Sequence, residues 1–181
     1  TRNFIKEGLN PFLPKYDDAS GVAENPIANP NRFRFVEFPL YNIFVYPFYL
    51  IFGVDVRFHR LVTILASIGS CVLLYFIVRK YTDKLIAFFT SFIFALLPFN
   101  IFFSRTTLPD PFFLFFALGM ILFLGNWIEK EKRIDLSLGF LFTAVAFLIK
   151  PWAVFFFLPL LYLLKKKSKR FTFYFLLFTF L

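Results

Sequence analysis

Five ionisable side chains lie at or near the ends of long apolar segments in this 181-residue chain: Glu37, Arg60, Arg105, Asp110 and Lys150. Charges at membrane depth are costly, so residues that carry them usually serve a functional site. A carboxylate beside an apolar membrane surface is partly desolvated, which raises its proton affinity and suits a general base. Acids and bases gathered at one membrane face therefore predict chemistry on a charged, membrane-borne substrate.

Each carboxylate also has a structural alternative. Asp110 lies between two prolines, where Pro111 suits the first turn of a helix and Asp110 suits its cap. This capping role is compatible with a place in the site. Glu37 can instead be a solvated loop acid that pairs with Arg34. The sequence leaves both alternatives open.

The cations have alternatives of the same kind. Lys150 interrupts a long apolar stretch, where it is either a lysine that snorkels from a helix end or a cation that holds a lipid phosphate. Arg105 can hold a phosphate through two parallel N–H donors, and Arg60 can do similar work. We interpret His59 as an interfacial residue rather than a ligand. With one His and one Cys, the chain is poorly suited to a zinc site, and we predict no cofactor. The sequence leaves open whether a divalent metal ion is required.

Apolar segments that are long enough to cross a membrane must position these residues. Hydrophobic residues make up 59% of the chain and its mean hydropathy is +0.71, which is typical of an integral membrane protein. Uncharged runs of 18 to 20 residues match a ~30 Å hydrocarbon core at ~1.5 Å per residue. We predict an all-α, polytopic transmembrane helical bundle with about five full or short spans and the start of a sixth. The predicted spans are residues 58–78, 85–104, 110–128, 134–149, 151–164 and 171–181.

Three short basic loops set the expected orientation, at residues 79–84, 130–133 and 165–170. Short loops rich in Lys and Arg remain on the cytoplasmic side. All three lie on one side only if residues 134–164 form two passes that turn at Lys150–Pro151. The net charge of +9 is then mostly a topology signal and an attraction to anionic membrane lipid, and no binding to nucleic acid is predicted.

Residues 1–57 differ in character from the rest, because prolines, glycines and scattered charges are typical of loops with short turns. A short helix at about 1–8 is compatible with that composition. Residues 38–53 are apolar but number only sixteen and contain two prolines, so we predict a helix at the outer membrane interface. Residues 1–57 are then one extracytoplasmic loop, and 58–181 form the transmembrane region in the plasma or inner membrane. A spanning helix at 38–53 would instead move Glu37 to the cytoplasmic side.

Short motifs in this chain resemble those of the polytopic GT-C glycosyltransferases of the protein O-mannosyltransferase and aminoarabinose-transferase type. The motifs are Arg2-Asn-Phe-Ile-Lys-Glu-Gly8, Asn10-Pro-Phe-Leu-Pro14, Glu37-Phe-Pro-Leu-Tyr41, Pro109-Asp110 and Lys150-Pro151. Their order and spacing extend over nearly the whole chain. One departure is Phe38, since the aminoarabinose transferases carry Lys at that position.

The resemblance implies transfer of a sugar from a polyprenyl-phosphate-linked donor to an acceptor at the extracytoplasmic face, with an inverting mechanism. It places the family's first-loop catalytic aspartate upstream of Thr1. Glu37 and Asp110 are then the candidate catalytic residues, which orient the acceptor or support the site. The candidate substrate-binding residues are Lys150, Arg105, Arg60 and Tyr41.

Two other classes of protein also place charges in a membrane. A fragment of a transporter, or of a flippase for lipid-linked substrates, contains intramembrane charges and broken helices. Such a protein predicts charges at the bilayer midplane and repeated halves, whereas here the charges cluster at one surface and no repeat is evident. A non-catalytic scaffold would have no use for five charges on one face. These comparisons favour the transferase.

Overall fold

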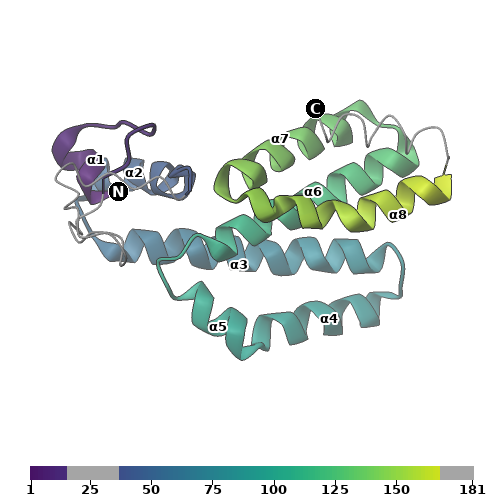
Figure 1. Ribbon diagram of the computed structural model, residues 1–181. Coiled ribbons are helices and arrows are strands. Elements are labelled where there is room, and N and C mark those ends of the chain that lie inside the picture. The colour runs from purple at the N-terminus through teal and green to yellow at the C-terminus, as the bar shows by residue number, and fades with distance from the viewer. Residues whose placement is uncertain (16–36, 168–181) are drawn as a thin grey trace, which may run out of the picture.

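The computed structural model describes residues 1–15 and 37–167. This part of the chain contains eight α-helices and one 3-10 helix, which confirms the all-α prediction. The elements are α1 (Arg2–Glu7), α2 (Leu40–Phe52), α3 (Val56–Arg79), α4 (Lys84–Leu96), α5 (Pro98–Ser104), α6 (Asp110–Lys130), α7 (Arg133–Ile149), η1 (Pro151–Phe157) and α8 (Leu158–Lys167). Helices α3, α4, α6, α7 and α8 run lengthwise through the molecule, with α1 and α2 at one end (Figure 1).

Two of the described helices, α3 with 24 residues and α6 with 21, are each long and apolar enough to cross a membrane. Helix α3 begins where the side chain of Asp55 accepts a hydrogen bond of 2.8 Å from the backbone N–H of Arg57. This cap satisfies one of the backbone donors that a helix start leaves unpaired. The helix then continues for more than six turns, carries no charge from Leu61 to Val78, and ends in the basic loop that begins with Arg79.

The predicted span at residues 85–104 is broken in the structure. Helix α4 ends at Leu96, α5 begins at Pro98, and the two axes differ by 60°. Proline cannot donate the backbone hydrogen bond that would continue α4, and its ring clashes with the preceding turn. If this bent pair counts as one span, the described residues contain three candidate spans. The predicted number of spans, five and the start of a sixth, is larger than this and stays a prediction. The sixth predicted span, residues 171–181, lies outside the described residues.

The chain reverses direction at Lys150. Helix α7 ends at Ile149, Lys150 is extended (φ −148°, ψ 124°), and the next seven residues form η1 before α8 begins. The segment at 151–164 is therefore a tighter 3-10 helix in its first half, where we expected one short helix. Helices α7 and α8 both pack against α6. The loop that joins α6 to α7 and the end of α8 lie at the end of the bundle opposite α1 and α2 (Figure 1).

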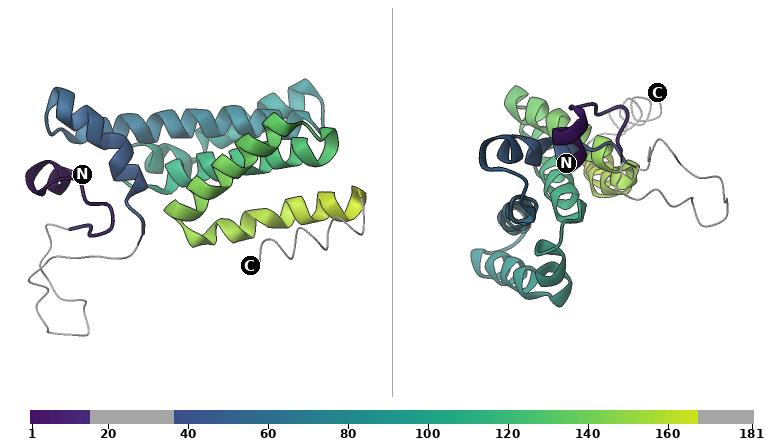
Figure 2. Two further views of the ribbon diagram at one scale, coloured as in Figure 1. Left: turned by 90° about the horizontal axis from the view of Figure 1, so that it is seen from above. Right: turned by 90° about the vertical axis from the view of Figure 1, so that its left-hand side faces the viewer.

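Helix α2 lies across the end of the bundle. It stops at Gly53, whose φ of 88° is a conformation that side chains other than glycine rarely adopt. Viewed from that end, α2 is seen along its length while α3 is seen end-on (Figure 2). This orientation is the one expected of a helix at a membrane surface. Its assignment to the outer interface stays a prediction.

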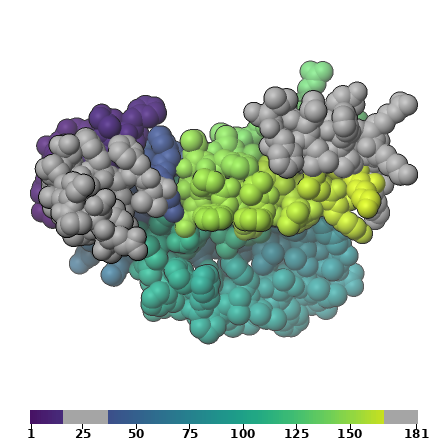
Figure 3. Space-filling model, in the orientation of Figure 1, coloured from purple at the N-terminus to yellow at the C-terminus, as the bar shows by residue number. Residues whose placement is uncertain are grey.

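Close packing between α6 and α7 depends on small residues. A Cβ atom at Gly119 would collide with the ring of Phe142, and one at Gly139 would collide with Leu124. Small residues let membrane helices approach closely, which is how such helices gain packing energy in lipid. On the other side of the molecule, α4 and α5 form an outer layer (Figure 3). Its exposed large side chains are Leu85, Ile86, Phe88, Phe89, Phe92, Ile93, Leu96, Phe99, Ile101 and Phe102.

Candidate active site

Three of the five ionisable residues come together at the end of the bundle that carries α2. The Lys150 Nζ atom donates a hydrogen bond of 2.7 Å to Oδ1 of Asp110 and lies 3.4 Å from Oε1 of Glu37. We call Glu37, Asp110 and Lys150 the charged trio. An ammonium group has three N–H donors and no acceptor. One lysine can therefore serve both carboxylates and still offer a third proton to a substrate oxygen.

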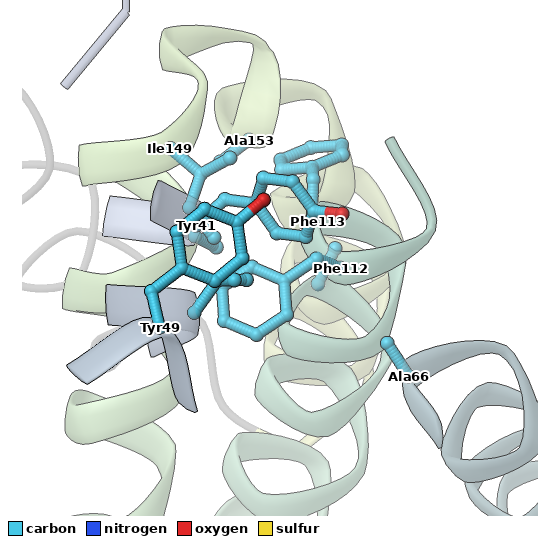
Figure 4. Packing of buried hydrophobic residues seen from close by; sticks show 10 residues of the cluster. Tyr41, Tyr49, Ala66, Phe112, Phe113, Ile149 and Ala153 are labelled. Atoms are coloured by element: carbon cyan, nitrogen blue, oxygen red, sulfur yellow. The ribbon is translucent and has the colours of Figure 1, made fainter. Parts of the chain in front are cut away.

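Buried apolar neighbours fix the position of each member of the trio. Ile149, directly before Lys150, is 1% exposed, and Phe112, two residues after Asp110, is 5% exposed. Tyr41, four residues after Glu37, is 4% exposed. All three belong to one buried cluster formed by α2, α3, α6, the end of α7 and η1 (Figure 4). The trio is thus carried on the rim of a packed core, although its members are far apart in sequence.

The trio keeps Lys150 charged. Burial alone would lower the pKa of Lys150, but the hydrogen bond and the charge of Asp110, together with the charge of Glu37, outweigh it and raise the pKa above the ordinary value of 10.5. The Lys150 side chain is 17% exposed, whereas the Glu37 and Asp110 side chains are 33% and 41% exposed. The most shielded side chain of the trio is therefore its cation, and the two carboxylate side chains are more exposed.

Asp110 does not cap α6, so the capping alternative is wrong. Asp110 is the first residue of the helix, the cap position is Pro109, and no side chain makes a capping hydrogen bond there. The carboxylate bonds to Lys150 instead. A negative charge in the first turn still suits the positive end of the helix dipole.

The alternatives for the other two members of the trio have different outcomes. Lys150 does not snorkel into solvent, since its side chain is only 17% exposed and its ammonium is paired with both carboxylates. The proposed partner of Glu37, Arg34, lies outside the described residues, so that alternative remains open. Arg60 and Arg105 are exposed and take no part in the ion pairs of the trio.

A cavity of about 430 Å³ opens beside the trio, within the size range of small-molecule sites. Glu37 and Tyr41 line it, and so do Pro109 and Ile149, the residues that precede Asp110 and Lys150. The remaining wall comes from the N-terminal segment, from α2 and the start of α3, and from the loop before α6. Its polar residues are Thr1, Arg2, Asn3, Lys15, Asn42, Tyr49, His59 and Thr107. Within residues 1–15 and 37–167, no three His, Cys, Asp or Glu side chains come together in a way that could hold a metal ion.

The hydroxyl of Tyr41 is already engaged by α3. It bonds to the backbone carbonyl of His59 at 2.9 Å and to Oγ1 of Thr63 at 2.7 Å. Burial raises the pKa of Tyr41 to about 12, against the opposing effect of the Thr63 hydrogen bond. Tyr41 is therefore neutral at physiological pH and offers the cavity its ring more than its hydroxyl. Its role in binding substrate stays a prediction.

Sequence reasoning assigned no part in the site to His59, which the structure places in the cavity wall. The ring nitrogens of His59 contact Oγ1 of Thr1 and the hydroxyl of Tyr49, each at 2.9 Å. Tyr41, Val45 and Tyr49 are all buried on one face of α2. Their spacing of four residues marks the buried face of a helix, and this was the available signal that the tyrosines face the protein.

Residues 37–181 match the sequence model of a family described as dolichyl-phosphate-mannose-protein mannosyltransferase. The match extends over more than half of the chain and includes the whole trio. The chain belongs to this family. No curated protein and no solved structure matches the chain.

Membership of the mannosyltransferase family makes the chain a GT-C membrane glycosyltransferase and confirms the resemblance inferred from the motifs. The family implies a dolichyl- or polyprenyl-phosphate-mannose donor. Together with the apolar helices, it also indicates a multi-pass membrane protein. The motifs at residues 2–14 precede the matched region.

Proposed function

We propose that this chain acts in the transfer of a sugar from a polyprenyl-phosphate-linked donor to an acceptor at the extracytoplasmic membrane face, with inversion at the anomeric carbon. The observation that carries the proposal is the position of Lys150, which pairs with Asp110 and Glu37 at the edge of the cavity. The family match supports the donor class. The sugar-phosphate bond is the bond that breaks, and the acceptor oxygen forms the new bond to the anomeric carbon.

The two carboxylates have different tasks in this proposal. Asp110, at 2.7 Å, fixes the Lys150 ammonium, while Glu37, at 3.4 Å, is held less tightly and lines the cavity. Glu37 is therefore the carboxylate placed to orient the acceptor hydroxyl and, as a general base, to take up its proton. A positioned base of this kind contributes roughly 10²–10⁴ in rate.

Lys150 supports the departure of the lipid phosphate. Its third N–H can donate to a phosphate oxygen as the negative charge of the leaving group develops, and a preorganised donor of this kind is worth roughly 10²–10³ in rate. Arg105, which is exposed and follows α5, and Arg60, at the start of α3, are further candidates for the phosphate. Arg2 in the cavity wall joins them, although the sequence did not single it out.

The extracytoplasmic face is supported by the distribution of charge. The basic loops after α3 and α6 lie at the end of the bundle opposite the trio (Figure 1). Basic loops remain in the cytoplasm, so the cavity would open on the outer side. A plasma or inner membrane is the location that fits this orientation.

The test compares Lys150→Met with Lys84→Met in membranes that contain the full chain. Lys84 is exposed at the basic end and is the matched control. With radiolabelled polyprenyl-phosphate mannose as donor, Lys150→Met should slow the transfer of label to lipid or protein roughly 10²–10³-fold, and Lys84→Met should leave it unchanged. Full transfer by Lys150→Met would remove the trio from the mechanism. Movement of the intact donor across the bilayer without transfer would indicate the flippase instead.

A further inference from the structure

We propose that His59 is a positioning residue, which holds α2 on α3 through Tyr49 and thereby sets the distance between Glu37 and Lys150. His59 does not contact the charged trio itself. Its effect on activity rests on the function proposed above, whereas its effect on the position of α2 does not. The two parts of the inference can therefore be tested separately.

The His59 side chain joins two segments that precede its own helix. Its Nδ1 atom lies 2.9 Å from the hydroxyl of Tyr49 in α2, and its Nε2 atom lies 2.9 Å from Oγ1 of Thr1. A neutral imidazole has one donor nitrogen and one acceptor nitrogen, and a hydroxyl can play either part. Both contacts can therefore be satisfied at once.

Two tyrosines enclose this side chain. The His59 ring meets Tyr41 at a centroid distance of 5.5 Å and Tyr49 at 5.3 Å, in both cases edge to face. The backbone carbonyl of His59 accepts a further hydrogen bond from the hydroxyl of Tyr41. Two turns of α2 are thus fastened to the first turn of α3 by one residue, and both tyrosines are at most 5% exposed.

The position of α2 controls only one of the two ion pairs of the trio. Glu37 lies three residues before α2 begins, so it moves with that helix. Asp110 and Lys150 belong to α6 and to the turn after α7. Helices α6 and α7 pack against each other extensively, whereas α2 contacts α7 to a much smaller extent. A change at His59 should therefore alter the Glu37–Lys150 contact and leave the Asp110–Lys150 contact intact. The ring of Phe112 also packs against Tyr41, so α2 should shift rather than detach.

Two conservative substitutions test the contacts of the two His59 nitrogens separately. Asparagine places a polar atom two bonds from Cβ, as Nδ1 is, so His59→Asn keeps a partner for Tyr49. Glutamine places its polar atoms three bonds from Cβ, at the same distance as Nε2. His59→Gln therefore keeps a partner for Thr1 and loses the partner for Tyr49. Tyr49→Phe removes the same contact from the other side, and Thr1→Val is the matched control for the Nε2 contact.

The experiment measures the distance between spin labels on α2 and α7, in the full chain with Cys71 replaced by Ser. Exposed positions for the labels are Leu50 (61% exposed) and Leu141 (56% exposed), each replaced by Cys. His59→Gln and Tyr49→Phe should shift or broaden the distance distribution, while His59→Asn and Thr1→Val should match the parent protein. In a transfer assay, the first pair should lower kcat roughly 10–100-fold with little change in KM, because a displacement near 1 Å is enough for such a loss.

Two results would contradict the positioning role of His59, and a third would contradict the proposed function. An unchanged distance distribution in both His59→Gln and Tyr49→Phe would overturn the positioning role, and so would equal impairment of His59→Asn and His59→Gln. If the parent protein transferred no sugar at all, the proposed function would fall, while the distance measurement would still decide the role of His59.

Discussion

Lys150 and Asp110 lie forty positions apart in the chain, and the ammonium of one donates a 2.7 Å hydrogen bond to the carboxylate of the other. This bond ties the turn after α7 to the first residue of α6. Glu37, from the segment before α2, approaches the same ammonium at 3.4 Å. An N-terminal acid and two later polar turns thus meet at one place, as the site hypothesis requires.

The two carboxylates should respond differently to loss of charge. Glu37→Gln should lower kcat by roughly 10²–10⁴ with little effect on stability, because it removes the proposed base. Asp110→Asn should instead lower the free energy of unfolding by about 0.5–1 kcal/mol, since solvent screens a pair whose carboxylate is 41% exposed. Transfer kinetics and thermal unfolding of the purified variants check both expectations. Equal kinetic losses in the two variants would contradict the division of tasks.

The packing of α6 against α7 should be sensitive to the size of the side chain at position 119. Gly119→Ala places a methyl group against the Phe142 ring, and overpacking of this kind costs roughly 1–3 kcal/mol. Gly125→Ala is the matched control in the same helix, because its Cβ atom would lie 3.6 Å from the nearest side-chain atoms. Thermal unfolding in detergent should separate the two variants. Similar melting temperatures would show that the ring moves aside at little cost.

The orientation of the bundle can be read by chemical labelling. Leu108, beside the cavity, and Tyr81, in the basic loop after α3, are 43% and 56% exposed. In a Cys71→Ser background, Leu108→Cys should react with a membrane-impermeant maleimide on intact cells, and Tyr81→Cys should react only after the membrane is opened. The reverse pattern would place the cavity in the cytoplasm and contradict the extracytoplasmic site.

Helix content and the location of polar turns were open to prediction, because both follow from local sequence. Long uncharged runs indicated α3 and α6, and the three basic loops required the reversal at Lys150. The break at Pro98 was not predicted, because it lies in an uncharged run that is long enough to span a membrane, and the loss of a backbone donor at proline leaves no mark on that charge pattern. This error shows that an uncharged run of sufficient length does not guarantee one continuous helix.

The contacts within the site could not be predicted in the same way, since they depend on tertiary packing. Asp110 has the sequence context of a helix cap, and only the position of Lys150 in space shows that its carboxylate has another partner. His59 likewise has its role through Tyr49 and Thr1, which approach it only when α2 folds across α3. Residue types therefore indicated a charged site, whereas the partners of each side chain within it could be identified only from the three-dimensional fold.

The most direct test of the charged trio is a double-mutant cycle on kcat/KM with Glu37→Gln, Lys150→Met and the two changes combined. Groups that act as one unit are strongly non-additive. We expect the double variant to lose no more activity than the more impaired single variant, because Lys150→Met already removes the ammonium that positions Glu37, so that loss of the carboxylate then has little further effect. Losses that multiply in the double variant would show that Glu37 and Lys150 act independently and would contradict a shared site.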